Sequence, residues 1–529
     1  MVKTLLKYLV LLMLFCLAKN SVAELASYKN KSGLEPGFLH VTPKDKLFYL
    51  LARTNIPNSP LVIYLAGGPG ASSMAPAFLA NGPWIFSHPF AHNTDFQLIK
   101  NQWSWNRIAN IVYLDQPRYV GYSYGNGPYI TSINEAGHDF LKWLLSFYKR
   151  YPEFKNRSLY LTGESFAGVY IAEYTHQILQ YNYKHLKNKI NLSGLFIQSG
   201  VIGDDNRFGL DVSPYTQLSF LCSQNMLPSS ACNNSEKDNL RHVLSLCMTY
   251  ISQTKKISFS KVKISDIYTV GKSNKSCDIY LENITTDAQT QPFTIPDNLK
   301  FPKHLKGQTV KEPINKMEFS KNSIIRRYLA YSPNPWNMSL ICQASGGFPP
   351  WCYDNYKMTQ FFNNSAIKLW LGKGLIPTKT QWEFAKFLIP VALLGEKLPI
   401  WPIERYYVET LQHNIPIVFA FGKNDWDINY ISAQVIINQI SYRAYGRLLF
   451  KQIPEKLTDM NKFILQNDRQ IGEYQSFENI TFAQIDNAGH MIGMDQPEAA
   501  YKLFSLLLSQ SQSPSNSVSL LSNTANRKS

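Results

Sequence analysis

Residues 159–168 read Leu-Tyr-Leu-Thr-Gly-Glu-Ser-Phe-Ala-Gly, an apolar run that ends in a serine between small residues. This order is typical of a sharp turn from a buried strand into a helix, in which the central residue has a strained backbone. The strain requires small residues two positions before and after Ser165, and the sequence has Gly163 and Ala167 there. We therefore predict a strand–turn–helix unit with Ser165 as a candidate nucleophile, although Gly-x-Ser-x-small also occurs by chance.

Other short apolar runs in the chain are bounded by Gly, Pro, Asn or Asp, as buried parallel strands require. They comprise residues 61–65, 111–114, 159–161, 195–197 and 415–421. Between two of them, Phe140, Leu144 and Phe147 recur at helical spacing. Strands that alternate with helices predict an α/β fold whose central sheet is mainly parallel and flanked by helices.

The N-terminal segment 1–23 has the composition of a cleavable signal peptide. Lys3 and Lys7 precede a short apolar stretch, and the segment ends in Ser21-Val22-Ala23. The apolar stretch is too short to span a bilayer. We therefore expect export to a periplasm, a lysosome-like vacuole or the outside of the cell, without stable membrane insertion.

The alternation of strands and helices breaks in the middle of the chain and then resumes, which predicts a cap inserted into the core. The C-terminal composition turns to Ser, Asn and Gln and predicts a disordered tail. The expected division is a first core part at 24–203, a cap at 204–353, a second core part at 354–507 and a tail at 508–529.

Six cysteines remain once the signal peptide, with Cys16, is removed. An even number in an exported chain predicts disulfide bonds, but 15 pairings are possible and the sequence does not choose among them. A zinc site is not indicated because no Cys-x-x-Cys spacing occurs. All six lie in the predicted cap: Cys222, Cys232, Cys247, Cys277, Cys342 and Cys352.

The chain is basic, with 53 Lys and Arg against 37 Asp and Glu and a formal net charge of +16. A concentrated basic patch would indicate a nucleic-acid partner. Here the basic residues are spread thinly, and the longest runs are pairs such as Arg326-Arg327. We expect a dispersed basic surface and no nucleic-acid partner, no metal and no cofactor. The oligomeric state stays open.

A nucleophilic serine needs a base and a group that orients the base. The candidate base is His490, in the segment 486–491 that directly follows the strand-like stretch 481–485, although a surface histidine is the simpler interpretation of that residue alone. The candidate acid is Asp425, which follows the run 415–421, with Asp427 as its rival. Either aspartate could instead cap the following helix. The chain order Ser, Asp, His is the order that α/β-hydrolases use.

The oxyanion of an acyl-transfer reaction needs backbone N–H donors, which a glycine-rich turn after an early strand can supply. Residues 66–73, Ala-Gly-Gly-Pro-Gly-Ala-Ser-Ser, follow the run 61–65 and fit this need. A phosphate-binding loop is disfavoured because neither Gly-Lys-Ser/Thr nor Gly-x-Gly-x-x-Gly is present. A merely tight turn is the remaining alternative.

Taken together, these segments resemble the serine carboxypeptidase family from about Gly33 to Leu506. The resemblance rests on Gly163 to Tyr170, Leu65 to Ser73, Ser104 to Tyr124 with its Asp115-Gln116-Pro117, Gly422 to Asn429, and Gly489 to Pro497. It implies the α/β-hydrolase fold, with Ser165 as nucleophile, His490 as base and Asp425 as the acid in preference to Asp427. It also implies Gly68 and Phe166 as the oxyanion hole, and Gly67 and Glu164 as substrate-binding residues.

Two departures from the family pattern concern recognition of the substrate. Family members have an asparagine before the two glycines and a second glutamate ahead of an Asn-Gly-Pro turn, where this chain has Ala66 and Ala80. Two close carboxyl groups raise one pKa, so that the pair can donate a hydrogen bond to a carboxylate. Without these partners, Glu164 is expected to ionise more easily and to repel the free C-terminal carboxylate of a peptide.

The resemblance implies an exported serine carboxypeptidase that releases C-terminal residues from peptides through an acyl-enzyme. An esterase or acyltransferase that uses the same triad is the first alternative. A non-catalytic binding homologue is the second, and the retention of all three triad residues disfavours it.

Overall fold

The computed structural model describes most of the chain outside its N-terminus, much of the predicted cap and the C-terminal tail. The described residues are 33–87, 97–203, 214–223, 240–257, 262, 274–277, 293–294, 309–310, 333–334, 337–341, 355–386, 403–450, 460–464 and 469–510. The predicted signal peptide and all but the first residues of the predicted tail lie outside them. The chain forms two compact units, the first made of 1–160, 188–191 and 354–397 and the second of 161–187, 192–353 and 398–529.

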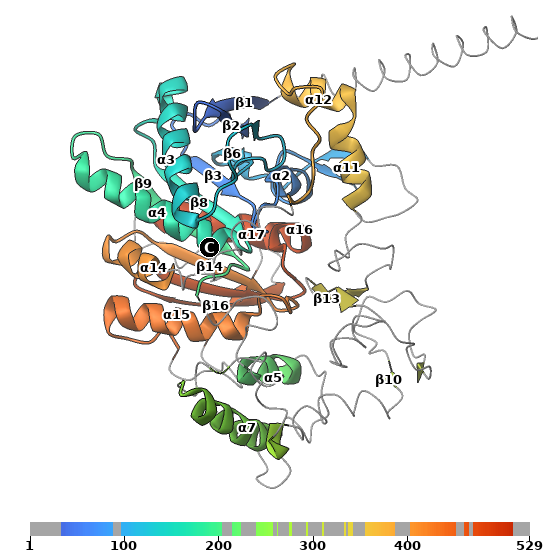
Figure 1. The fold of residues 1–529 in the computed structure, drawn as a ribbon, viewed down its shortest axis with the longest axis vertical. Helices are drawn as coiled ribbons and strands as arrows, with labels where there is room; N and C mark the ends of the chain where they lie inside the picture. The colour runs from blue at the N-terminus through green and yellow to red at the C-terminus, as the bar shows by residue number, and fades with distance from the viewer. Residues whose placement is uncertain are drawn as a thin grey trace, which may run out of the picture. The chain divides into compact units, whose positions relative to one another are not determined.

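The first unit contains strands in the order β1, β2, β6 and β3 (Figure 1). Strand β2 pairs antiparallel with β1, β6 and β7, whereas β3 and β6 pair in parallel with Val62 opposite Ile111. The strands are β1 (Leu34–His40), β2 (Asp45–Ala52), β3 (Leu61–Leu65), β6 (Asn110–Leu114) and β7 (Tyr124–Gly125). Every side chain of β3 and β6 is buried, as the unbroken apolar runs predicted.

Helix α3 (Ile133–Arg150) packs on β1 in the first unit. The hydroxyl of Ser132 caps it by accepting a hydrogen bond from the backbone N–H of Glu135, while Lys149 and Arg150 occupy its last turn. The remaining elements of this unit are α2 (Met74–Leu79), the hairpin β4 (Trp84–Phe86) with β5 (Leu98–Lys100), the short 3-10 helices η1 (Trp105–Arg107) and η2 (Pro152–Phe154), α11 (Asn355–Asn363) and α12 (Ser365–Gly372).

The second unit contains strands in the order β8, β9, β14, β17, β16 and β15. Strands β9, β14 and β17 are parallel to one another, and β16 and β15 continue the sheet antiparallel. These strands are β8 (Leu159–Glu164), β9 (Leu192–Gln198), β14 (Ile417–Gly422), β15 (Asn461–Ile464), β16 (Gln470–Phe477) and β17 (Ile480–Ile485). The predicted mixed, mainly parallel α/β sheet is therefore confirmed.

Helices of the second unit cover its strands (Figure 1). Helix α14 lies between α4 and α15, and its Tyr407 ring contacts Phe419 of β14, while α17 packs on β9 and β14. The helices are α4 (Ala167–Lys184), α14 (Ile403–Gln412), α15 (Tyr430–Tyr445), the short α16 (Ile492–Asp495) and α17 (Pro497–Gln510). Because α17 ends at Gln510, residues 508–510 of the predicted tail are helical.

Only parts of the predicted cap are described. Helices α5 (Pro214–Ser223) and α7 (Leu240–Lys255) pack together around a small core that includes Leu218, Leu244 and Ile251. A disulfide bond joins Cys247 to Cys277, and Cys222 is also disulfide-bonded. Cys232, Cys342 and Cys352 lie outside the described residues. The short strands here are β10 (Phe293–Thr294), β11 (Thr309–Val310), β12 (Pro333–Asn334) and β13 (Asn337–Ile341).

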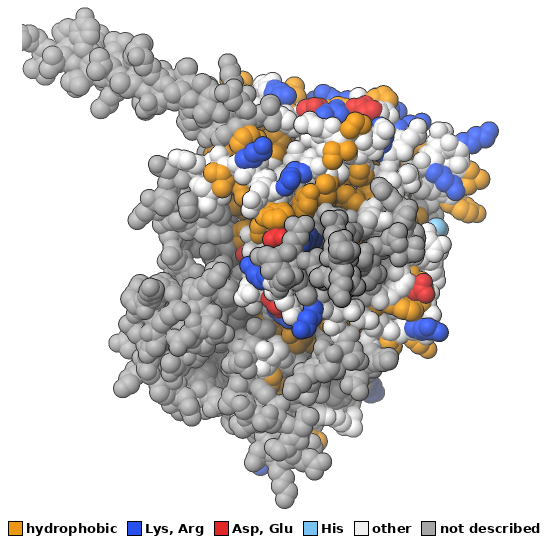
Figure 2. Space-filling view, turned by 180° about the vertical axis from the view of Figure 1, so that it is seen from behind, with side chains coloured by type: hydrophobic (Ala, Val, Ile, Leu, Met, Phe, Trp, Pro, Cys, Tyr) orange, Lys and Arg blue, Asp and Glu red, His pale blue; other side chains and the backbone are white. Residues whose placement is uncertain are grey.

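The surface of the described residues matches the thin spread of basic side chains in the sequence. Figure 2 shows Lys and Arg side chains scattered over one face among acidic and apolar ones. No helix among the described residues is both long and apolar enough to cross a bilayer. In the same part of the chain, no group of three or more His, Cys, Asp or Glu side chains is arranged to hold a metal ion.

Candidate active site

Ser165 lies in the predicted turn between β8 and α4, and its backbone has the left-handed φ of +63°. Non-glycine residues rarely adopt this conformation, which costs free energy and persists only where the surrounding structure enforces it. The surroundings are the end of β9: the Ser165 N–H donates to the carbonyl groups of Gln198 and Ser199, and the Ser165 carbonyl accepts from Val201. These hydrogen bonds hold the turn at the end of β8 beside the end of β9.

The start of α4 approaches the backbone beyond β9 so closely that only glycine fits at residue 168. A Cβ atom on Gly168 would lie 2.3 Å from the carbonyl oxygen of Val201. The Gly168 carbonyl in turn accepts a hydrogen bond of 2.7 Å from the hydroxyl of Tyr407 on α14. Helix packing thus fixes the start of α4, directly after its N-cap residue Phe166.

Asp425 and His490 follow the C-terminal ends of β14 and β17, which are neighbours in the sheet. Oδ2 of Asp425 lies 2.8 Å from Nδ1 of His490, and both side chains are buried. Oδ1 of Asp425 accepts the N–H groups of Asp427 and Ile428, which fixes the carboxylate. The helix cap that either aspartate might have formed is instead Asn429, whose side chain accepts from Ser432 at the start of α15.

The loops that carry Asp425 and His490 are hydrogen-bonded to each other. The N–H of Asn424 donates to the carbonyl of Ala488, and a Cβ atom on Gly422 would lie 2.2 Å from the carbonyl oxygen of Gly489. The N–H of Gly489 donates to Oδ2 of Asp495 at 2.8 Å. Sequence reasoning assigned no role to Asp495, although it stands in the quoted stretch that follows the histidine.

Opposing effects set the pKa of His490. Burial lowers it, but the charge and hydrogen bond of Asp425, together with the charges of Asp427 and Glu164, raise it to about 9. The raised pKa indicates that the site stabilises an imidazolium, the form that a catalytic histidine takes after it accepts a proton. Glu164 is therefore near enough to act electrostatically on His490. Ser165, Glu164, Asp425 and His490 all belong to the second unit.

Gly67 and Gly68 belong to the first unit, in the glycine-rich turn after β3. Gly68 has a φ of +105°, and a Cβ atom there would lie 2.7 Å from the backbone nitrogens of Gly70 and Ala71. The turn is closed by a hydrogen bond from the N–H of Ala71 to the carbonyl of Gly67. Ala66 and Ala80, which replace the polar residues of the family pattern, are both buried.

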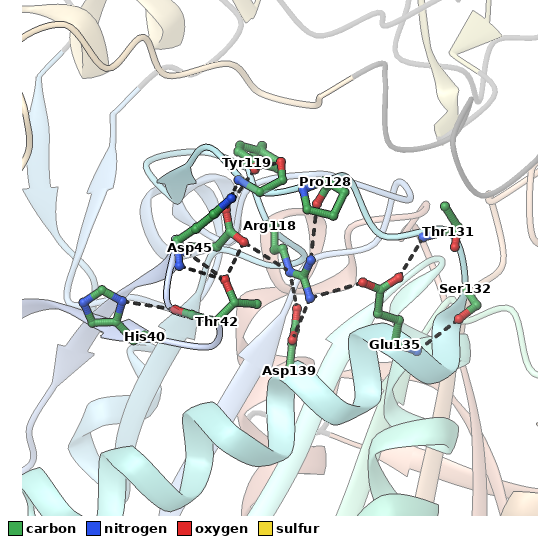
Figure 3. A network of polar contacts seen from close by, with 12 residues as sticks. His40, Thr42, Asp45, Arg118, Tyr119, Pro128, Thr131, Ser132, Glu135 and Asp139 are labelled. Atoms are coloured by element: carbon green, nitrogen blue, oxygen red, sulfur yellow. Dashed lines mark hydrogen bonds and ion pairs between the residues drawn. The ribbon is translucent and has the colours of Figure 1, made fainter.

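A second polar cluster lies between β2 and α3 in the first unit, around Arg118 (Figure 3). Asp139 and Glu135 project from α3 toward the guanidinium group, and Asp139 binds it at 2.6 and 3.0 Å. Tyr119, with a φ of +74°, places its hydroxyl 2.9 Å from Oδ1 of Asp45. This left-handed backbone is one that glycine adopts more readily than tyrosine.

The chain is similar to known proteins in both sequence and fold. A family model described as serine carboxypeptidase matches residues 26–510. Carboxypeptidase Y homolog A of Sclerotinia sclerotiorum is 28% identical over 467 residues, which cover 88% of this chain and 70% of the relative. Carboxypeptidase Y of Candida albicans is 24% identical, with 88% and 71% covered. The crystal structure of Kex1(delta)p, a prohormone-processing carboxypeptidase from Saccharomyces cerevisiae, matches the fold with a TM-score of 0.60 at 18% identity, covering 90% of this chain and 91% of that one.

Proposed function

The chain belongs to the serine carboxypeptidase family, and from this premise we propose that Ser165, Asp425 and His490 form its catalytic triad. Its enzyme class is that of a serine-type carboxypeptidase. The observation that carries the assignment of residues is the buried contact of 2.8 Å between Asp425 and His490, on loops that follow neighbouring strands. The strained turn at Ser165 supports the choice of nucleophile.

In the proposed reaction, Oγ of Ser165 attacks the carbonyl carbon of the last peptide bond and His490 takes the hydroxyl proton. The C–N bond then breaks, and His490 returns the proton to the nitrogen of the leaving amino acid. Water repeats the attack on the ester of Ser165 and releases the shortened peptide. Asp425 holds the imidazole in the tautomer that can accept the proton and stabilises the imidazolium.

We assign the oxyanion hole to the backbone N–H groups of Gly68 and Phe166. Their support is local: the positive φ of Gly68 turns its backbone in a way that other residues resist, and Phe166 is the N-cap of α4. N–H groups at a helix start favour developing negative charge. Each N–H would donate to the substrate oxygen when it becomes negative in the tetrahedral intermediate.

Recognition of the substrate is proposed to involve Glu164 and Gly67, with a peptide as the substrate. Ala66 and Ala80 supply no polar side chain to share with Glu164, so this site lacks two groups that hold a free carboxylate in the family pattern. This departure favours a second candidate function, in which the same triad acts as an esterase or acyltransferase. The expected export rests on residues 1–23, and the expected cap at 204–353 would shape access to the site.

A labelling experiment tests the catalytic assignment. An organophosphonate probe should label the wild-type enzyme on Ser165 and should not label Ser165→Ala. Absence of labelling in the folded wild-type protein would leave only the non-catalytic alternative.

A substrate comparison tests the preference for a free C-terminus. The ratio kcat/KM is measured on a blocked dipeptide and on its amide, from pH 4 to 8, with a chromogenic ester as reference. A strong preference for the free acid supports the carboxypeptidase assignment despite Ala66 and Ala80. Equal rates on acid and amide, with rapid ester cleavage, support the esterase or transferase.

A further inference from the structure

One buried carboxylate, that of Asp115, is hydrogen-bonded to the end of the glycine-rich turn in the first unit. Asp115 directly follows β6 and is fully buried. Its Oδ1 accepts hydrogen bonds from Oγ of Ser72 at 2.7 Å and from the N–H of Ser73 at 2.9 Å. Its Oδ2 accepts the N–H of Tyr122 at 2.9 Å. The motif Asp115-Gln116-Pro117 shows no local pattern that indicates this role.

Ser72 and Ser73 link Asp115 to the rest of the turn through their own hydrogen bonds. Oγ of Ser73 donates to the carbonyl of Leu114 at 2.7 Å and accepts the N–H of Ala66, the residue with which the turn begins, at 3.0 Å. Oγ of Ser72 accepts the indole N–H of Trp382 at 2.9 Å. The segment from Ala66 to Ser73 is therefore closed on itself through Ser73 and fixed to β6 through Asp115.

The backbone of Gly121 packs tightly against the carboxylate of Asp115. A Cβ atom on Gly121 would lie 2.1 Å from Oδ2 of Asp115 and 2.7 Å from Oγ of Ser72. On its other side, the turn is held by backbone bonds from Ser72 N–H to the carbonyl of Phe384 and from Lys386 N–H to the carbonyl of Gly70. A shift of Asp115 would therefore be passed on to the turn.

A carboxylate in this place is costly for folding. Burial raises the pKa of Asp115 to about 7, although its hydrogen-bond donors lower it. The donors described above are neutral backbone and hydroxyl groups, and burial of a charge without a paired opposite charge is unfavourable. A well-packed apolar residue would avoid this cost but could not hold the backbone N–H of Ser73 and the hydroxyl of Ser72 together.

We infer that Asp115 is a positioning residue for catalysis, which holds the backbone N–H of Gly68 in place through Ser72 and Ser73. The inference rests on the proposed function, in which that N–H donates to the oxyanion. Donors contribute to the rate when they are already oriented before charge develops, because no reorganisation is then needed. A displacement of about 1 Å in a positioned group can cost about 100-fold in rate.

The main variant is Asp115→Asn, which keeps one carbonyl oxygen for Ser72 and Ser73 but turns an NH₂ group toward the N–H of Tyr122. We expect kcat to fall by about 10- to 100-fold, the range below the full loss of an oxyanion donor, while KM stays within about twofold of wild type because ground-state contacts are unchanged. The rate of organophosphonate labelling should fall with kcat. Affinity for a peptidyl boronate, which forms a tetrahedral adduct, should fall by a similar factor, while affinity for the product acid should not.

Ser72→Ala is the second variant and tests the same link if Asp115→Asn does not fold. It removes one hydrogen bond to Asp115 and should lower kcat by about fivefold, the equivalent of about 1 kcal/mol. The matched control is Asn438→Ala: Asn438 on α15 is also buried and ties down the backbone of Phe450 through two hydrogen bonds. It should lower the melting temperature with little effect on kcat.

The outcomes separate this inference from the proposed function. If wild type is not labelled by the phosphonate, the proposed function fails. If wild type is labelled but Asp115→Asn retains its kcat and boronate affinity, the positioning role is wrong and Asp115 is structural only. A loss of kcat that Asn438→Ala matches at equal loss of stability would overturn the inference in the same way.

Discussion

Oδ2 of Asp425 contacts Nδ1 of His490 at 2.8 Å, and the two side chains are 0% and 2% exposed. Because little water screens this buried pair, the attraction between the Asp425 carboxylate and a protonated imidazole is stronger than it would be at the protein surface. The rival Asp427 lies two residues further along the chain, donates its own N–H to Oδ1 of Asp425, and acts on the histidine through its charge.

Asp425→Asn should lower kcat by about 10⁴-fold with a small effect on KM, since an amide can hold the imidazole in the wrong tautomer. Steady-state kinetics on a chromogenic ester measure the effect without reliance on a free carboxylate. Asp427→Asn is the matched control and should retain most of kcat. Equal losses in the two variants would contradict the assignment of Asp425.

Glu164→Gln should move the acid limb of the pH profile of kcat/KM to lower pH. The Glu164 charge contributes to the raised pKa of His490, and a general base works only when it is neutral. Removal of that charge lowers the pKa, so a larger fraction of His490 is neutral at acid pH. The measurement uses an amidated substrate or an ester, so that repulsion of a substrate carboxylate does not contribute. A shift toward higher pH would refute the electrostatic link.

Arg118→Met should lower the free energy of unfolding by about 3–5 kcal/mol, because it leaves the carboxylate of Asp139 buried without its partner. Asp139 is 3% exposed and Arg118 is 5% exposed. The double variant Arg118→Met/Asp139→Leu should lose less than Arg118→Met alone, since neither charge then remains buried and unpaired. Urea unfolding followed by fluorescence compares the two. A double variant as unstable as the single one would show that side-chain packing, not charge pairing, dominates.

Replacement of Cys247 and Cys277 by serine should destabilise the helix pair α5 and α7. The disulfide closes a loop with a sequence separation of 30, which corresponds to about 3–4 kcal/mol in the loop-entropy model. Limited proteolysis should cut the variant within residues 240–277 faster than wild type. Ser165 should still react with the phosphonate, since the turn at Ser165 is held by β9 and α4. An unchanged cleavage rate would show that the small core holds this region without the bond.

The strands that the sequence predicted share one property, which is burial on both faces. Residues 61–65 and 159–161 are uninterrupted apolar runs, and such a run is sufficient to predict a buried parallel strand. Strands β1 and β16 were not predicted, because each mixes buried and exposed positions and the sequence shows no continuous run. The turn at Ser165 was detectable because the small residues that it requires, Gly163 and Ala167, lie within the same short segment.

The local sequence pattern does not distinguish Asp425 from Asp427 as the catalytic acid. Both follow the same strand, and the residues alone left both open until the family resemblance favoured the first. The structure separates them by one contact with a residue that is 65 positions away in sequence. The same limit explains why Asp115 was assigned no role: its contact with Ser72 spans 43 positions, and the contact of Ser72 with Trp382 spans 310.

The left-handed backbone of Ser165 has a consequence for engineering. Its amide and carbonyl groups are hydrogen-bonded to residues 198–201 at and just beyond the end of β9, so residues outside the turn at Ser165 determine its backbone conformation. Transplanting residues 163–168 into another sheet would move the serine but not the forces that hold it in place. A design that transfers this serine must therefore include the ends of both adjacent strands. A design that copies only the short motif would give an ordinary surface serine.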